Sequence, residues 1–178
     1  MKMPKLAPKG MSLVEMLVAS ALTSLLFMVV ASASVFSRYS LAALSNYCEL
    51  QDQSRFALDR ITREIRQAKA VTAFSSTAFT LRNGDGTTTQ FTYNPDNATL
   101  VRTTGGRSEV LLQECNSLTF SNFQRNTVPG TYIQYPVTST DTSKLIQLNW
   151  VCSRPVMGSR RNTECVQSAK VVIRVDTK

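Results

Sequence analysis

The stretch KGMSLVEMLVASALTSLLFMVVASASVFSR, residues 9–38, decides how this chain is organised. Within it, residues 16–37 form a run of 22 consecutive uncharged side chains. A helix of that length rises roughly 33 Å, which is enough to cross the hydrocarbon core of a bilayer. We therefore predict a membrane-spanning helix. Two alternatives stay open, a buried core helix and a secretory signal peptide cut near Ala31-Ser32-Ala33.

Charge is unevenly distributed on the two sides of this run. The 178-residue chain has 20 basic and 12 acidic side chains, a formal net charge of +8. Lys2, Lys5 and Lys9 precede the run with no acidic residue among them, whereas Arg38 alone follows it directly. Because positive charge is retained in the cytoplasm, we expect a cytoplasmic N-terminus in the inner membrane and an exported C-terminal part.

Composition excludes several classes of protein. With 43% hydrophobic and 18% charged residues, the chain is not disordered throughout. The absence of histidine excludes catalysis by Ser-His or Cys-His pairs and metal sites built on histidine. No catalytic constellation stands out, so we expect a non-enzymatic protein without a cofactor or a bound metal.

Glu15 is the one charge inside the apolar stretch that follows the leader. A carboxylate in an apolar helix is costly in lipid and needs a partner, which makes it a candidate functional residue. The alternative is a structural role at the headgroup boundary, where the carboxylate complements the dipole of the helix N-terminus.

The helix is predicted to continue beyond the membrane, over residues 38–70, because no Gly or Pro occurs between Met11 and Asn83. One face of this continuation is largely apolar, and the opposite face is charged through Arg55, Asp59 and Arg63, which are four residues apart. We expect the apolar face to carry a globular head; a coiled-coil contact with a partner is the alternative. This face comprises Tyr47, Leu50, Ser54, Leu58, Ile61, Ile65 and Ala68.

Residues 71–178 have the composition of a β-rich head. Turn signals at 83–86, 94–97 and 105–106 separate short strands that alternate apolar and polar side chains. We predict an antiparallel meander packed on the helix, an α+β fold. The predicted strands are Ala78–Arg82, Thr88–Tyr93, Thr99–Thr103, Glu109–Gln113, Leu118–Gln124, Lys144–Val151 and Val166–Val175.

Two loops offer weaker signals. Residues 125–143 form a long irregular stretch whose Tyr132, Ile133 and Tyr135 either make a contact surface or fold back over the sheet. Arg154, with Arg160 and Arg161, places positive charge in the last loop, where binding of a phosphate or a DNA backbone competes with the simpler interpretation of a solvated loop.

Four cysteines occur, at positions 48, 115, 152 and 165, and an exported head meets an oxidising compartment. Cys152 and Cys165 flank one loop and are predicted to face each other across the last hairpin, where a disulfide constrains the unfolded chain by about 3 kcal/mol. Cys48 with Cys115 is a second predicted pair that joins the helix to the sheet. A four-cysteine zinc site is not favoured, because no Cys-x-x-Cys motif exists.

Residues Lys9-Gly10-Met11-Ser12-Leu13-Val14-Glu15 resemble the processing site of type IV prepilins and type II secretion pseudopilins. Members share a basic leader, a glycine, a cleaved bond and a glutamate as the fifth mature residue, followed by an apolar helix. Here Glu15 is fifth after Gly10. Two departures are Met11 where most members have Phe, and Ser24 and Ser32 where major pilins tend to have Gly or Pro. The uninterrupted helix, with the arginine-rich residues 60–68, looks more like PilW- and GspJ-type minor subunits.

The resemblance implies roles for individual residues. Prepilin peptidase would cut between Gly10 and Met11 and N-methylate Met11, and Glu15 would pair with the α-amine of a neighbouring subunit. The chain would then comprise a leader (1–10), an assembly helix (11–37), an amphipathic continuation (38–70) and a head (71–178).

The expected function is that of a minor pilin or pseudopilin, cleaved by prepilin peptidase and joined to other subunits in a type IV pilus or a type II secretion pseudopilus, at initiation or at the tip. The alternatives are a DNA-uptake subunit and a membrane-anchored enzyme or receptor.

Overall fold

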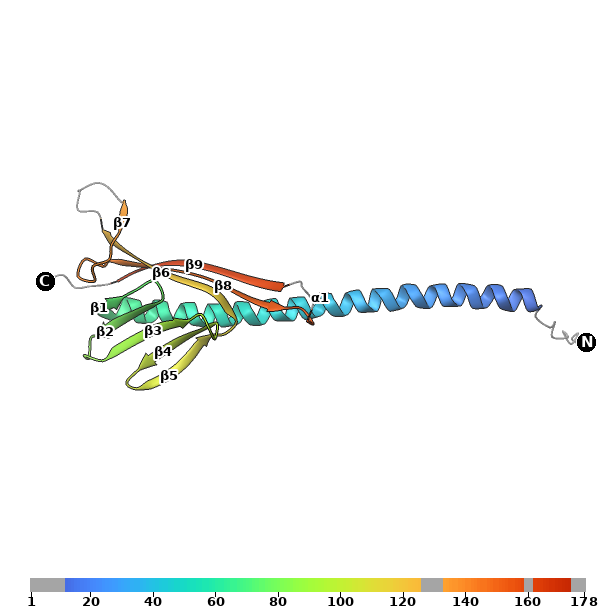
Figure 1. Ribbon diagram of the computed structural model, residues 1–178, viewed down its shortest axis with the longest axis horizontal. Helices are drawn as coiled ribbons and strands as arrows, with labels where there is room; N and C mark the ends of the chain where they lie inside the picture. Colours follow the sequence, from blue (N-terminus) through green and yellow to red (C-terminus); the bar gives the residue numbers. More distant parts are fainter. Residues whose placement is uncertain (1–11, 126–132, 159–161, 174–178) are drawn as a thin grey trace, which may run out of the picture. The chain divides into compact units, whose positions relative to one another are not determined.

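A computed structural model describes residues 12–125, 133–158 and 162–173 of the chain. The chain divides into two units, residues 1–42 and 43–178. One helix, α1 (Leu13–Gln67), contributes to both (Figure 1). Ser12 caps its start, because the Glu15 N–H donates to the Ser12 hydroxyl at 3.3 Å. The prediction of a long helix without interruption is confirmed.

The helix ends three residues earlier than the predicted Ala70. Residues after Gln67 enter strand β1 (Ala68–Phe74), which pairs with β2 (Ala78–Asn83). Ala68 and Val71 of β1 are both buried, so this segment contributes to the core as a strand. Val71 and Thr72 are β-branched, which favours extended backbone over helix at this position.

The first sheet is an antiparallel meander in the order β1-β2-β3-β4-β5. Its three remaining strands are β3 (Thr88–Asn94), β4 (Thr99–Thr104) and β5 (Arg107–Leu112). The predicted turns at 83–86, 94–97 and 105–106 are confirmed as the connections between successive strands. Gly105 and Gly106 both have positive φ, 56° and 78°, which a two-residue hairpin loop of this kind requires.

A second antiparallel sheet has the order β7-β6-β8-β9. Its strands are β6 (Cys115–Arg125), β7 (Gln134–Pro136), β8 (Leu145–Pro155) and β9 (Asn162–Val172). The prediction of a single meander is therefore wrong. The change of sheet falls between β5 and β6, at Glu114, whose φ of 55° turns the chain out of the first ladder.

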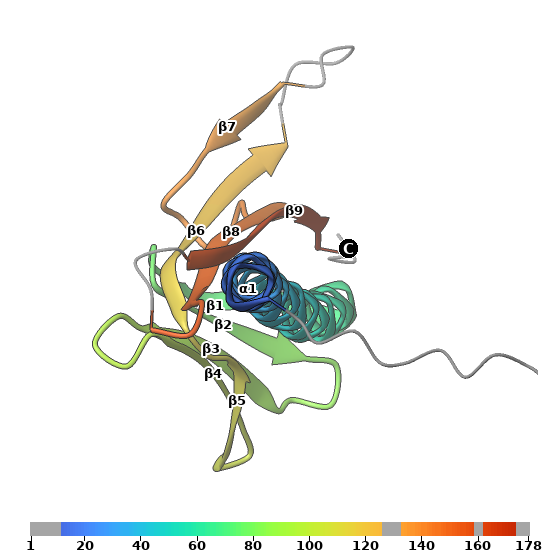
Figure 2. The ribbon, with the colours of Figure 1, turned by 90° about the vertical axis from the view of Figure 1, so that its right-hand side faces the viewer.

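Both sheets pack on the part of α1 that belongs to the second unit. In Figure 2 this part of the helix has β8 and β9 on one side and β1 to β3 on the other. The rings of Phe79 and Phe91 stack at 4.9 Å in the first sheet, and Phe120 of the second sheet meets Phe79 edge-on at 4.8 Å. The predicted α+β architecture, a long N-terminal helix on antiparallel sheets, is confirmed.

The predicted apolar face of the helix continuation is largely correct. Leu50, Ser54, Ile61 and Ile65 are buried in the core, and Leu58 is half-buried against it. Two members depart from the prediction, since Tyr47 is exposed and Ala68 belongs to β1. The helix also buries Ala57 and Glu64, which the spacing did not single out.

Candidate functional site

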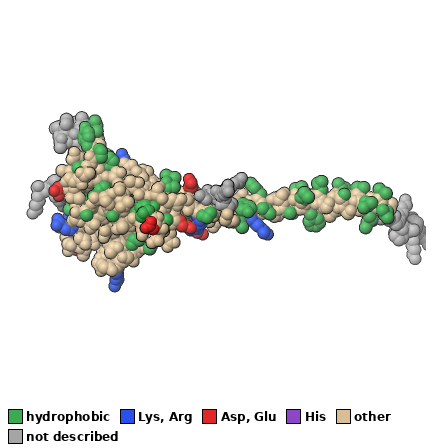
Figure 3. Space-filling model, viewed as in Figure 1, with side chains coloured by type: hydrophobic (Ala, Val, Ile, Leu, Met, Phe, Trp, Pro, Cys, Tyr) green, Lys and Arg blue, Asp and Glu red, His purple; other side chains and the backbone are tan. Residues whose placement is uncertain are grey.

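The first half of α1 is an apolar helix whose side chains are exposed in the part of the chain that the structure describes. The helix is long and apolar enough to cross a membrane, and none of its most apolar 18-residue window is buried. Hydrophobic side chains line the face of this helix seen in Figure 3. Exposed apolar surface of this extent marks a surface that meets a membrane or another protein. The large exposed apolar side chains of this segment include Leu13, Val14, Leu22, Phe27, Met28 and Phe36.

Hydroxyl side chains within this apolar segment are bonded to the helix itself. Ser20 and Ser24 donate to carbonyls three residues earlier, at 2.9 and 2.8 Å, and Thr23 donates to the carbonyl of Ala19 at 2.7 Å. The Ser32 hydroxyl donates to the carbonyl of Val29 and the Ser34 hydroxyl to that of Val30, both at 2.8 Å. A hydroxyl satisfied in this way does not need water, so these residues are compatible with a hydrocarbon environment.

Glu15 lies in the first turn of α1 and is exposed. Its carboxylate is therefore at the positive end of the helix dipole, a favourable position for an anion. The predicted cleavage residues Gly10 and Met11 lie outside the described residues. Whether Glu15 has a partner in another chain stays a prediction.

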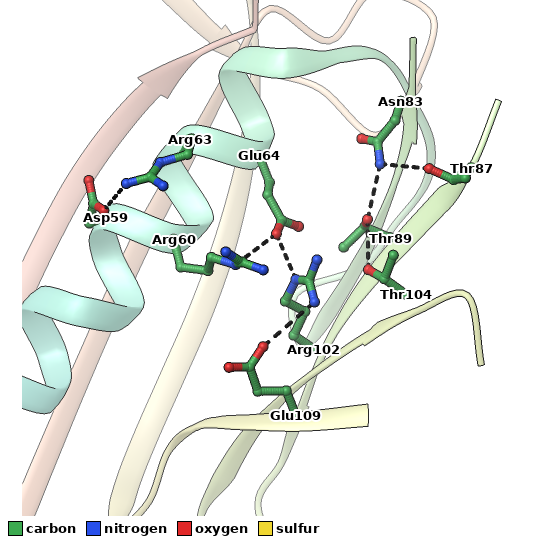
Figure 4. Close-up of polar contacts among 10 residues, drawn as sticks. All are labelled: Asp59, Arg60, Arg63, Glu64, Asn83, Thr87, Thr89, Arg102, Thr104 and Glu109. Carbon is green, nitrogen blue, oxygen red and sulfur yellow. Dashed lines mark hydrogen bonds and ion pairs between the residues drawn. The ribbon is translucent and has the colours of Figure 1, made fainter. Parts of the chain in front are cut away.

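A charged cluster that the sequence analysis missed joins the helix to the first sheet (Figure 4). Glu64 is only 9% exposed, and its Oε1 lies 2.7 Å from Nε of Arg102 on β4. Arg60 Nε lies 3.1 Å from the same oxygen but forms no hydrogen bond, and Arg102 also approaches Glu109 at 3.6 Å. The spacing of Arg60 and Glu64, four residues apart, was the available signal, but such pairs usually lie on exposed faces.

The predicted charged face of the helix is confirmed as exposed. Asp59 and Arg63 form an ion pair at 2.6 Å, and both side chains are more than half exposed. Arg55 is exposed as well.

The strand register of the second sheet brings three of the four cysteines together. Cys152 of β8 lies opposite Cys165 of β9, as expected for the last hairpin. Cys115 of β6 also lies opposite Cys152, whereas Cys48 is exposed on α1. The second predicted pair, Cys48 with Cys115, stays a prediction. All four cysteines are free thiols in this structure.

The structure describes some of the basic and aromatic loop residues. Arg154 binds Glu49 on α1 and Glu114, the latter at 2.7 Å, and these hydrogen bonds, to Glu49 first, raise its pKa. Its charge is thus matched by two carboxylates, which weakens the case for a phosphate ligand there. Arg160, Arg161 and Tyr132 lie outside the described residues, while Ile133 and Tyr135 are exposed and do not fold back over the sheet.

In comparisons with known proteins, no family model, no curated protein and no solved structure matches this chain.

Proposed function

We propose that this protein is a structural subunit of a type IV pilin-like filament, a minor pilin or a type II secretion pseudopilin. The observation that carries the proposal is the exposed apolar helix with Glu15 in its first turn, five residues after Gly10. This combination is the processing and assembly signature that the sequence resembles. A simple membrane anchor accounts for the apolar helix and for a carboxylate in its first turn, but not for the five-residue spacing between Gly10 and Glu15.

The helix is suited first to a membrane and then to a bundle of like helices. Its apolar side chains are exposed on all sides, and its hydroxyls are satisfied internally. Within a bilayer, an apolar helix that the described residues leave exposed is free to exchange lipid for the helices of other subunits. Other pilin-like subunits are therefore the proposed partners, met helix to helix.

Glu15 supplies a charge that only another group can balance. Cleavage after Gly10 would create a positive α-amine on Met11, four residues before the carboxylate. A pair formed between subunits would lower the cost of both charges in lipid and would fix the axial register of the two helices.

The uninterrupted course of α1 favours a minor subunit over a major one. Ser24 and Ser32 occupy positions where major pilins tend to have helix-breaking residues, and both hydroxyls bond to the helix backbone. The three lysines of the leader support a cytoplasmic N-terminus, so that the head is exported to the periplasm or the cell surface.

Processing of the precursor tests the proposal. In cells with an active prepilin peptidase, intact-mass analysis should find a mature chain that begins at Met11 and carries one added methyl group. Gly10→Val should leave the precursor uncut, because a side chain blocks close approach of the peptide bond. Ala7→Val, in the same leader, is the matched control and should be cut normally.

A mature start beyond Ala33 would identify a secretory signal peptide and refute the proposal. Retention of the leader by the wild-type chain in those cells would also refute it.

A further inference from the structure

Three thiols lie side by side in the second sheet. Cys115, Cys152 and Cys165 occupy β6, β8 and β9, directly opposite one another in the strand register, and all three are buried. Cys152 is in the middle, so two neighbours compete for one thiol. No group of three or more His, Cys, Asp or Glu side chains in the described parts of the chain is placed to hold a metal ion.

Cys115 and Cys152 form a non-hydrogen-bonded pair. The N–H of Ser153 donates to the carbonyl of Glu114 at 3.0 Å, so the backbone hydrogen bond lies beside the two cysteines and not between them. In antiparallel sheets this pattern identifies a non-hydrogen-bonded pair, whose Cα atoms lie about 4.5 Å apart in a regular ladder, with the side chains at their closest. Here the pair stands at the end of the regular register, because a shift follows between Cys115 and Ser117.

Cys152 and Cys165 form a hydrogen-bonded pair. The N–H of Ile173 donates to the carbonyl of Lys144 at 2.9 Å, which makes Leu145 and Val172 a non-hydrogen-bonded pair. The register then continues without a shift for seven residues to Cys152. Because the two kinds of pair alternate, Cys152 and Cys165 are a hydrogen-bonded pair, with Cα atoms about 5.5 Å apart.

The difference decides which bond forms with less strain. A disulfide needs Cβ atoms about 3.5–4.5 Å apart. Opposite residues in antiparallel strands have Cβ atoms about 4.5–5.5 Å apart, and non-hydrogen-bonded pairs lie at the short end of that range. The bond between Cys115 and Cys152 therefore requires little movement, whereas a bond to Cys165 requires the backbones of β8 and β9 to approach.

The polar surroundings of the three thiols agree with this assignment. The neighbouring Cys152 thiol raises the pKa of Cys115, as burial also does, and the Cys115 thiol lowers the pKa of Cys152. Cys165 instead lies 3.5 Å from the hydroxyl of Ser54, which also accepts the indole N–H of Trp150 at 3.2 Å. The Cys165 thiol thus has a polar partner on the helix.

We propose that, in an oxidising environment, Cys115 and Cys152 form the disulfide of the head and that Cys165 remains a buried thiol. With a glutathione disulfide as oxidant, the Cys152 thiolate attacks one sulfur and releases one glutathione thiolate. The Cys115 thiolate then attacks Cys152 and releases the second, so two electrons and two protons leave the protein. That this happens in the cell rests on the proposed export of the head.

The choice of partner is tested on the purified full-length chain in detergent, independently of leader cleavage and assembly. The chain is equilibrated at a series of ratios of oxidised to reduced glutathione, the remaining thiols are alkylated, and peptides are mapped by mass spectrometry. The expected product links Cys115 to Cys152 and carries alkylated Cys165. Exposed Cys48 should be alkylated fastest in the native chain.

Two matched variants sharpen the test. Cys165→Ser should become oxidised at the same glutathione ratio as the wild-type chain. Cys115→Ser should require a ratio at least about tenfold more oxidising, since its bond would be strained. A wild-type link between Cys152 and Cys165, or no internal disulfide at any ratio, overturns the proposal. If Cys115→Ser does not fold, as judged by Trp150 fluorescence, the wild-type peptide map still decides.

Discussion

Replacement of Ile61 by alanine tests how strongly the head depends on the helix. Ile61 is fully buried in the core that α1 shares with both sheets. The change removes three carbon atoms, worth about 2.4 kcal/mol at ~0.8 kcal/mol for each buried methylene. The cavity left behind adds to this, so we expect the free energy of unfolding to fall by about 2–5 kcal/mol.

The assay is urea unfolding of the full chain in detergent, followed by fluorescence. Trp150 is the only tryptophan and is 1% exposed, so its emission reports on packing between β8 and the helix. Phe56→Ala, on the same helix but 60% exposed, is the matched control and should change stability by less than about 0.5 kcal/mol. Equal effects of the two substitutions, or no effect of Ile61→Ala, would refute the packing described here.

Two further perturbations address the same interface. A chain that begins at Ala43 should express as a folded head, whereas one that begins at Ala68 exposes both sheet faces and should aggregate; size-exclusion chromatography distinguishes them, and equal behaviour would contradict packing on the helix. Glu64→Ala leaves Arg102 with only its weaker contact to Glu109 and should lower the free energy of unfolding by roughly 2–4 kcal/mol. Asp59→Ala removes the exposed ion pair with Arg63 and should lower the free energy of unfolding by less than about 1 kcal/mol in the same assay. A loss equal to that of Glu64→Ala would contradict the burial of the ion pair between Glu64 and Arg102.

Local signals predicted most of the fold. The uncharged run and the absence of Gly and Pro predicted α1, and the turn residues placed the hairpins of the first sheet. The end of the helix was missed because Ala68–Phe74 also continues a helical pattern, and only pairing with β2 makes it a strand. The separation into two sheets depends on the backbone at Glu114, for which a glutamate gives no signal.

The candidate site shows the same division between local and long-range information. Glu15 and its spacing from Gly10 are read directly from the sequence. The hairpin suggested that Cys152 faces Cys165, but the position of Cys115 opposite Cys152 depends on pairing between strands that are distant in sequence. Burial of Glu64 likewise follows from where β4 brings Arg102.

The central claim is that the helix joins other subunits through Glu15, and one measurement tests it most directly. A photo-reactive residue at Leu22, an exposed position of the apolar segment, is used to cross-link the mature chain in native membranes. Cross-links are compared for the wild-type chain, Glu15→Ala, Glu15→Gln and the control Ser20→Ala, with leader cleavage scored in parallel.

We expect the wild-type chain and Ser20→Ala to cross-link to proteins that have their own apolar N-terminal helix with an acidic fifth mature residue. Both Glu15 variants should be inserted and cleaved but should lose most of these cross-links, because the neighbour's α-amine has no partner. Undiminished cross-linking of both Glu15 variants would reduce Glu15 to a charge at the end of a membrane anchor and contradict the account.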